Sequence, residues 1–332
     1  MTDRARESLS QLRPYDGKVR RPFTSLLLAL CAVGSSLAWS ALPQSPHNFT
    51  VLAVSRGTLW AGTYRSGVLR SRDGGLRWRP AGLRGDYVAA LAARSGYLYA
   101  AAQRCNHQGL CRNLGIFLRK PGGRSGWLPA GLAGRQVTAI SISLTTPFLL
   151  DAATLQGVYG SRDGGARWKL LLPQPALSLQ VNPADSNQVL VGTAGQGLWY
   201  TEDGGVTWTL VRKKGLWTAV AYNPLQPGEL LAGRSRCGDS GCVGDVFVSY
   251  DGGKSFAAAG IPGAGPAQIL VGAGGQLVVR TFNNGLYLSA KPAPPWRQEQ
   301  PSPDRSDVTA AAFWDHQLLA SYFGRELYRG RP

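Results

Sequence analysis

The sequence is poor in acidic residues and in histidine, and this shortage narrows the chemistry that it can support. Its 332 residues contain 19 Asp and Glu, 36 Lys and Arg, and 3 His. Beyond residue 38 the glutamates are Glu202, Glu229, Glu299 and Glu326, and none lies in a setting typical of a catalytic carboxylate. A glycosidase usually needs paired carboxylates, one as nucleophile and one as general acid. The sequence therefore argues against that class of enzyme.

Other catalytic signatures are missing as well. There is no phosphate-binding glycine loop, no Ser/His/Asp arrangement of recognisable spacing and no cluster of potential metal ligands. We therefore predict that the protein is not an enzyme and that it holds neither a cofactor nor a metal ion.

Positive charge and turn-forming residues, by contrast, are abundant. The formal net charge is +17, and 29 of the 36 basic residues are arginine, whose planar side chain suits carboxylates and phosphates better than lysine does. An anionic partner is therefore expected. The 43 Gly and 21 Pro favour many short turns over long helices, while 44% apolar residues suffice for a large core.

Residues 1–38 have the pattern of an export segment. Residues 1–22 carry six basic side chains and form a cytoplasmic tail or the basic region of a signal peptide. The apolar residues 23–38 are either a signal peptide cleaved after Ser36-Leu37-Ala38 or a membrane anchor, and Cys31 weakly matches a lipoprotein box. Every alternative exports residues 39–332. We expect a membrane-associated protein on the lumenal or periplasmic side of a bacterial thylakoid or plasma membrane, and no nucleic-acid partner.

The remaining four cysteines form two local pairs, Cys105 with Cys111 and Cys237 with Cys242. In an exported protein such pairs favour disulfides, each closing a small loop. The alternative is zinc, because His107 lies between the first two cysteines, but the chain lacks a Cys-x-x-Cys repeat.

A repeat runs through residues 39–332. Four segments share the pattern S/T-x-D-G-G-x-x-W/F: Ser71 to Trp78, Ser161 to Trp168, Thr201 to Trp208 and Ser249 to Phe256. Two weaker copies end at Trp127 and Trp296, so the terminal aromatic side chains fall at positions 78, 127, 168, 208, 256 and 296. A period near forty built of short strands predicts the blades of a β-propeller.

Each unit contains an inner apolar strand, and the sequence contains seven of them, so we predict an all-β, seven-bladed propeller. The last unit lacks a fourth strand before Pro332. Trp39 precedes Trp78 by one repeat length and is therefore in register with the repeat. We expect residues 39–43 to supply the missing strand and close the ring, which removes an exposed sheet edge.

The aspartates of the repeat have a structural explanation. An Asp at a hairpin turn accepts backbone N–H bonds, and the two glycines after it allow positive φ. We therefore interpret Asp73, Asp163, Asp203 and Asp251 as scaffold residues without a catalytic role.

These repeats resemble those of the Asp-box, or bacterial neuraminidase repeat, propellers, which include sialidases, sortilin-type receptors and Ycf48-like photosystem II assembly factors. The chain is most similar to the Ycf48-like family, which are seven-bladed propellers of this length. The resemblance implies a monomeric propeller that docks, through an arginine-rich face, on a membrane protein complex such as photosystem II reaction-centre subunits or assembly intermediates. An anionic membrane surface is a further possible partner.

The predicted partner-binding residues lie in loops between the second and third strands of the blades. They are basic or aromatic: Tyr64, Arg65, Arg104, Arg112, Arg234, Arg236, Arg280, Tyr322 and Arg325. Arg and Tyr are enriched at interface hot spots, and both cysteine pairs lie in the same loops. Arg72 and Arg77 on the opposite face show that basic residues are not confined to one side.

The function predicted from the sequence is that of a non-catalytic binding platform that assists assembly, repair or stability of a membrane protein complex. The alternative is a sialidase-like propeller that binds or hydrolyses glycans, with arginines holding a sugar carboxylate. The Arg-Ile-Pro motif that precedes the repeats in sialidases is missing.

Overall fold

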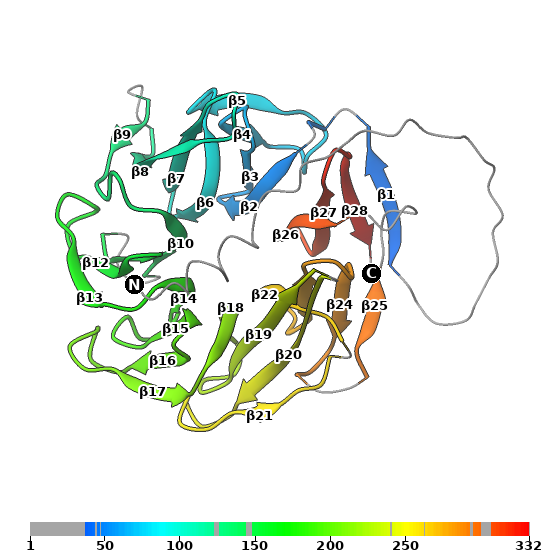
Figure 1. Ribbon diagram of the computed structural model, residues 1–332. Helices are drawn as coiled ribbons and strands as arrows, with labels where there is room; N and C mark the ends of the chain where they lie inside the picture. The colour runs from blue at the N-terminus through cyan, green and yellow to red at the C-terminus, as the bar shows by residue number, and fades with distance from the viewer. Residues whose placement is uncertain are drawn as a thin grey trace.

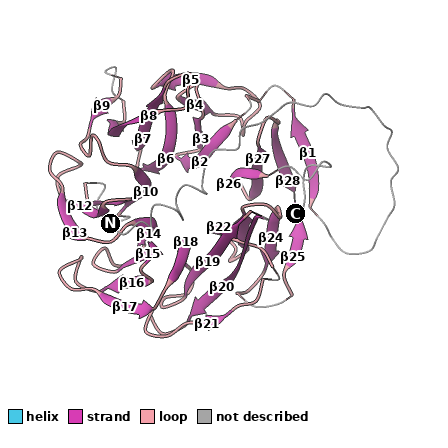
Figure 2. Ribbon diagram, viewed as in Figure 1, coloured by secondary structure: helices cyan, strands magenta, loops and turns pink. Residues whose placement is uncertain are grey.

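The computed structural model describes residues 37–43, 45–46, 48–122, 126–143, 148–239, 241–261, 263–292, 295–299 and 307–331. The predicted tail, 1–22, and most of the apolar segment 23–38 lie outside the described residues. The described part of the chain is all-β (Figure 2). Within it, no helix is long and apolar enough to cross a membrane.

Twenty-eight strands form six antiparallel sheets arranged around a central axis, which is a β-propeller (Figure 1). Three four-stranded sheets come first in the chain. They contain β2 (Phe49–Ser55), β3 (Thr58–Thr63), β4 (Val68–Ser71) and β5 (Arg79–Gly82); β6 (Tyr87–Arg94), β7 (Tyr97–Cys105), β8 (Cys111–Arg119) and β9 (Leu128–Pro129); and β10 (Val137–Ile142), β11 (Leu150–Thr154), β12 (Gly157–Ser161) and β13 (Lys169–Leu172).

An eight-stranded sheet follows. It contains β14 (Ala176–Val181), β15 (Val189–Gly195), β16 (Leu198–Thr201), β17 (Thr209–Arg212), β18 (Gly215–Tyr222), β19 (Leu230–Gly238), β20 (Gly241–Ser249) and β21 (Ala257–Ala258). Its two runs of four consecutive strands are joined where β15 meets β18, through the pairs Ala194–Leu216 and Gly195–Gly215 and a bridge between Gln196 and Gly215.

Two further four-stranded sheets complete the ring. The first contains β22 (Pro266–Val271), β23 (Leu277–Thr281), β24 (Leu286–Ser289) and β25 (Arg297–Glu299), and the second contains β26 (Val308–Trp314), β27 (Gln317–Tyr322), β28 (Leu327–Arg331) and β1 (Ala38–Leu42). The apolar core lies between neighbouring sheets. Leu59 of β3, for example, packs in one cluster with Leu319 of β27, and Ile116 of β8 packs in another with Leu150 of β11.

The strand nearest the N-terminus closes the ring, which confirms the prediction made from the register of Trp39. β1 pairs antiparallel with β28 (Figure 1). In this pairing Trp39 lies opposite Gly330. The carboxylate of Glu299 holds this strand against the preceding sheet. It accepts a hydrogen bond from the Trp39 indole at 3.1 Å and one from the Leu37 amide at 3.4 Å, and it pairs with Arg297 at 2.9 Å.

A similar contact recurs at four places around the ring, where the tryptophan before an outer strand donates its indole N–H to the outer edge of the preceding unit. Trp78 is an exception, because its indole donates to Gly75 of its own turn. Trp127 donates to the carbonyl of Ala81 at 2.7 Å, Trp168 to that of Ala130 at 2.8 Å, and Trp296 to that of Ala259 at 2.8 Å. Trp39 therefore makes the equivalent contact where the ring closes, and the acceptor there is the Glu299 carboxylate in place of a backbone carbonyl.

One carboxylate in the core has an incomplete set of hydrogen bonds. Asp151 of β11 is 2% exposed, and its Oδ1 has no hydrogen-bond partner among the described residues. Burial raises the pKa of this carboxyl group to about 6, and the nearby Arg162 opposes the rise only in part. Asp151 therefore makes the stability of the propeller depend on pH.

The closing contact predicts a stability loss for Trp39→Ala. The substitution removes a ring that packs against Gly330 and also the hydrogen bond to Glu299, so we expect the free energy of unfolding to fall by about 2–3 kcal/mol. Trp39→Phe keeps most of the packing and should cost about 1 kcal/mol. Urea denaturation measures both, and equal stability of all three proteins would show that β1 does not hold the ring.

Asp151→Asn should alter the pH dependence of stability. Since the folded-state pKa lies above the ordinary value of 3.8, the folded wild type is favoured at low pH and loses that stability as the pH rises from about 4 to about 6. The variant lacks this loss. We expect its stability relative to wild type to increase by up to about 3 kcal/mol between pH 4 and pH 7. A difference that stays constant across this range would contradict the assignment.

Candidate functional site

The propeller has two faces, which we name by the turns that form them. The loop face contains the loops between second and third strands and the connections from one unit to the next. These segments lie side by side, since the amide of Gly85, in a connection, donates a hydrogen bond to the carbonyl of Arg65, in a loop, at 2.9 Å. The Asp-box face contains the repeat turns and the turns between first and second strands. There, the Gly164 amide donates to the Phe148 carbonyl at 3.0 Å.

The Asp-box turns bind their own backbone. Asp73 Oδ1 accepts hydrogen bonds from the Ser71 hydroxyl at 2.7 Å and the Arg77 amide at 2.9 Å, and the Gly75 amide donates to Ser71 Oγ at 2.8 Å. The turns of Asp163, Asp203 and Asp251 repeat this pattern. Gly75 has a φ of 92°, and a Cβ there would lie 2.7 Å from Leu327, so the turn requires glycine. All four carboxylates are oriented toward the turn and hold its shape.

The charge of these carboxylates is stabilised by the same bonds. Hydrogen bonds from the amide and the guanidinium of Arg167 lower the pKa of Asp163 to about 2. The Thr207 hydroxyl and amide hold the pKa of Asp203 well below its ordinary value. A group held ionised in this way is poorly suited to donate a proton in catalysis.

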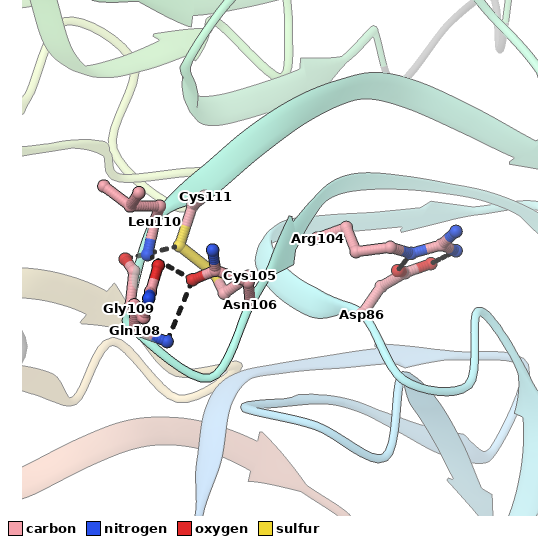
Figure 3. The surroundings of a disulfide bond; sticks show 8 residues. All are labelled: Asp86, Arg104, Cys105, Asn106, Gln108, Gly109, Leu110 and Cys111. Carbon is pink, nitrogen blue, oxygen red and sulfur yellow. Dashed lines mark hydrogen bonds and ion pairs between the residues drawn. A yellow bond between two sulfur atoms is a disulfide. The ribbon is translucent and has the colours of Figure 1, made fainter.

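The hairpin of β7 and β8 is closed by a disulfide between Cys105 and Cys111, as predicted (Figure 3). Both sulfurs are in the bond, so the alternative of zinc thiolates does not apply here. Arg104, the residue before Cys105, makes a bidentate ion pair with the buried Asp86. Its Nε lies 2.7 Å from Oδ1 and its Nη2 lies 3.2 Å from Oδ2 of that carboxylate. Arg112 lies opposite Arg104 in the strand pair and is exposed.

The hairpin of β19 and β20 has a second disulfide, between Cys237 and Cys242. Arg234 lies 3.5 Å from Asp245 on the neighbouring strand, and its guanidinium lies 5.1 Å from the ring centre of Phe247. Arg236, two residues further toward the loop face, is exposed. Among the described residues, neither Arg112 nor Arg236 has an ion pair.

The loop between β3 and β4 contributes Tyr64 and Arg65. Tyr64 packs edge-on against Tyr87, with ring centres 5.5 Å apart, and the exposed Arg65 lies near the Tyr64 ring. Arg325 is exposed in the turn between β27 and β28. The loop face thus exposes Arg65, Arg112, Arg236 and Arg325 at its surface, each from a different sheet.

Two of the predicted partner-binding residues lie inside the molecule instead. Tyr322 is 1% exposed and packs edge-on against Tyr328. Arg280 points toward the axis of the ring, where its Nη1 donates to the Val308 carbonyl at 2.9 Å and its Nη2 to the Ala267 carbonyl at 3.4 Å. Burial lowers the pKa of Arg280 to about 10, so it stays charged at neutral pH. Tyr322 is therefore unavailable to a partner, whereas the half-buried Arg280 lines the axial cavity and is held there by backbone carbonyls.

Arg280 completes a contact that other sheets make with hydroxyl groups. The seven strands around the axis, β2, β6, β10, β14, β18, β22 and β26, each have a bulge near the start, which leaves a carbonyl without its ladder partner. Thr50 donates to the carbonyl of Val88 at 2.6 Å, and Thr138 to that of Ala176 at 3.0 Å. Arg280 does the same for Val308, so it joins β23 to the next sheet.

A cavity of about 430 Å³ lies on the axis between these strands. Its described lining includes Arg94 and Arg280 but no Asp, Glu or Tyr. A sialidase-like site would need arginines that converge beside a Tyr/Glu pair. The described cavity wall does not have that arrangement.

Sequence reasoning missed Asp86 and Leu110. Asp86 directly precedes an inner strand, and a lone acid at that position is a signal for a buried ion pair. Leu110 is the only aliphatic residue between Cys105 and Cys111, and it is 70% exposed. Its place as the single aliphatic residue of a short loop between two cysteines is visible in the sequence.

Comparisons with known proteins support the fold. No protein-family model and no curated protein matches the chain. A solved structure described as YCF48 bound to D1 peptide is similar, with a TM-score of 0.67 and 14% identity, covering 92% of this chain and 100% of that one. YCF48 from Cyanidioschyzon merolae gives a TM-score of 0.63 and 14% identity, covering 89% and 99%. An ancestral GH74 enzyme gives 0.65 and 16%, covering 86% and 47%.

At these identities the likeness shows the propeller fold alone. YCF48 and a GH74 enzyme share this shape with the chain, so the shape by itself does not separate a binding protein from a hydrolase. The function must therefore be argued from the loop face and the cavity.

The position of Arg280 predicts a structural role. Arg280→Leu leaves the carbonyls of Val308 and Ala267 without their donor, so we expect the free energy of unfolding to fall by about 2–4 kcal/mol. Arg236→Leu removes an exposed arginine from the loop face and should change the free energy of unfolding by less than about 0.5 kcal/mol. Chemical denaturation of both variants is the measurement. Equal losses of unfolding free energy for the two variants would contradict the structural role of Arg280.

Proposed function

We propose that the loop face is a non-catalytic docking surface through which an exported, membrane-associated protein assists assembly, repair or stability of a membrane protein complex. The observation that carries the proposal is the set of exposed arginines on this one face, Arg65, Arg112 and Arg236, two of which lie on hairpins closed by disulfides. A disulfide limits the conformational entropy that a loop loses on binding. Exposed guanidinium groups are suited to carboxylates of a partner.

The comparison with YCF48 supports this function without establishing it. That protein is described as bound to a D1 peptide, so a propeller of this shape can hold a segment of another protein. By analogy, the proposed partner is an acidic segment of a membrane complex, with photosystem II subunits as the candidates that the Ycf48 resemblance suggests.

We count the ring as seven blades. The two halves of the eight-stranded sheet each consist of four consecutive strands, and they are paired along one short edge. Their sequences also contain separate Asp-box turns, at Asp203 and Asp251. Two adjacent blades that touch along one short edge account for the larger sheet.

Glycan hydrolysis, as in sialidase-like or GH74 propellers, is the alternative that we consider less well supported. The described cavity wall contains no carboxylate, and Glu229 and Glu299 are buried, bonded to Asn223 and to the β1 strand respectively. Glycosidases usually need two accessible carboxylates.

Export with cleavage of the leader is the localisation that we propose. The ring holds Leu37 and Trp39 through Glu299, so the apolar run that remains outside it extends only from Phe23 to Ser36. An uncleaved helix of this length would measure about 21 Å, whereas the apolar core of a bilayer is about 30 Å thick. This difference supports a signal peptide over a spanning anchor. Cleavage after Ala38 would remove Leu37 and the first residue of β1, so the cleavage that we propose lies before Leu37.

Charge reversal tests the proposed docking surface. We expect Arg65, Arg112 and Arg236, changed together to Glu, to abolish capture of an integral membrane complex from solubilised membranes of the protein's own host. The control changes Arg72, Lys120 and Lys254 of the Asp-box face to Glu, which alters the net charge by the same amount. Quantitative mass spectrometry of the captured proteins is the measurement.

The two triple variants separate the possible outcomes. Loss of capture with the loop-face variant alone supports the proposal. Equal capture by both variants would refute the docking surface. Hydrolysis of a sialoside or xyloglucan substrate by the wild type would establish glycan hydrolysis instead.

A further inference from the structure

The hairpin of β7 and β8 extends beyond its neighbours on the loop face. β7 and β8 have nine residues each, whereas β3 and β4 of the preceding sheet have six and four. Both hairpins start from the Asp-box face, so the extra residues lie at the loop-face end. Three more residues at about 3.3 Å each raise the tip by about 10 Å.

Hydrogen bonds and a disulfide connect the residues at the tip of this hairpin (Figure 3). Asn106 Oδ1 accepts hydrogen bonds from the amides of Gln108 at 3.0 Å and Leu110 at 2.9 Å, and the Asn106 amide donates to the Leu110 carbonyl at 3.0 Å. The disulfide closes the base, and the ion pair of Arg104 with Asp86 fixes the strand below it. Both backbone polar groups of Leu110 are therefore bonded within the tip.

The side chain that this fixed backbone presents is apolar. Leu110 is 70% exposed, and Arg112, exposed and without an ion pair among the described residues, lies two positions further along. A single exposed leucine on a protein surface needs no explanation by itself. What makes this one informative is that its backbone is ordered before any partner arrives.

The second disulfide-closed hairpin repeats the combination. In β19 and β20, Val243 is 44% exposed and lies directly opposite the exposed Arg236, one residue pair from the disulfide. Both extended hairpins thus combine a disulfide, an exposed aliphatic side chain and an exposed arginine. Two independent instances on the same face favour a shared binding role over chance.

We propose that Leu110 is an apolar anchor that inserts into a pocket of a partner protein, and that carboxylates at the rim of that pocket receive Arg112. This inference rests on the proposed docking function and deepens it, because it names the chemistry of the partner surface. An ordered loop loses little conformational entropy on binding, so the burial of the leucine contributes almost in full to affinity. The arginine at its side then selects an acidic rim over a basic one.

Photo-crosslinking in the full-length chain tests the anchor directly. A benzophenone amino acid replaces Leu110, and in a control it replaces Val206, which is 78% exposed on the Asp-box face. We expect irradiation in solubilised host membranes to give a protein adduct from position 110 and none from position 206. Adducts with lipid alone, equal adducts from both positions, or no adduct from position 110 would overturn the proposal.

Substitution distinguishes this proposal from the docking function on which it rests. Leu110→Ser should lower capture of the complex about tenfold or more, whereas Leu110→Met keeps an apolar side chain and should stay within about twofold of wild type. Val206→Ser is the matched surface control. Loss of capture by the triple Arg→Glu variant together with full capture by Leu110→Ser refutes the anchor and leaves the docking face intact. The reverse result refutes the arginine face, and with it the acidic rim proposed for Arg112, and keeps only the insertion of Leu110.

Discussion

Closure of the ring is the constraint on which the rest of this structure depends. The last sheet takes its outer strand from the start of the folded chain, and the carboxylate of Glu299 binds Trp39, Leu37 and Arg297 at that point. Without β1, β28 would be an unpaired edge, and edges of this kind pair with other chains. The cavity and the loop face keep their geometry only while the ring is closed, because each sheet is positioned by its two neighbours.

The sequence predicts this architecture well where a structural feature repeats at a fixed spacing along the chain. Trp39 is recognisable because it continues the spacing of the Asp-box aromatic residues, and the turns of Asp73 and Asp251 are recognisable because glycines at positive φ have few alternatives. The pairing of Cys105 with Cys111 follows from proximity in the chain. Local spacing determines each of these features, so no knowledge of the tertiary structure is needed.

The candidate site is harder to predict because an arginine's role depends on what lies within reach of its side chain. Arg280 and Arg236 both lie in the second strand of their units, β23 and β19, yet Arg280 points toward the carbonyl of Val308 and Arg236 lies at the surface. Arg104 is held by Asp86, a residue 18 positions earlier in the chain. Tyr322 lies one position further along its strand than the equivalent of Arg280, which turns it to the other side of the strand and into the apolar cluster between two sheets. Such assignments require the register of neighbouring strands.

The pairing of β1 with β28 also fixes where the two ends of the folded chain emerge. Ala38 lies opposite Arg331, and because the strands are antiparallel, β1 starts and β28 finishes on the Asp-box face. The two ends are therefore adjacent, on the side of the disc opposite Arg65 and Leu110. An affinity tag or fusion partner attached at either end would therefore lie on the Asp-box face and leave the loop face exposed to solvent. The same adjacency makes this chain a natural subject for circular permutation, with a short linker between the ends and new termini opened elsewhere in the ring.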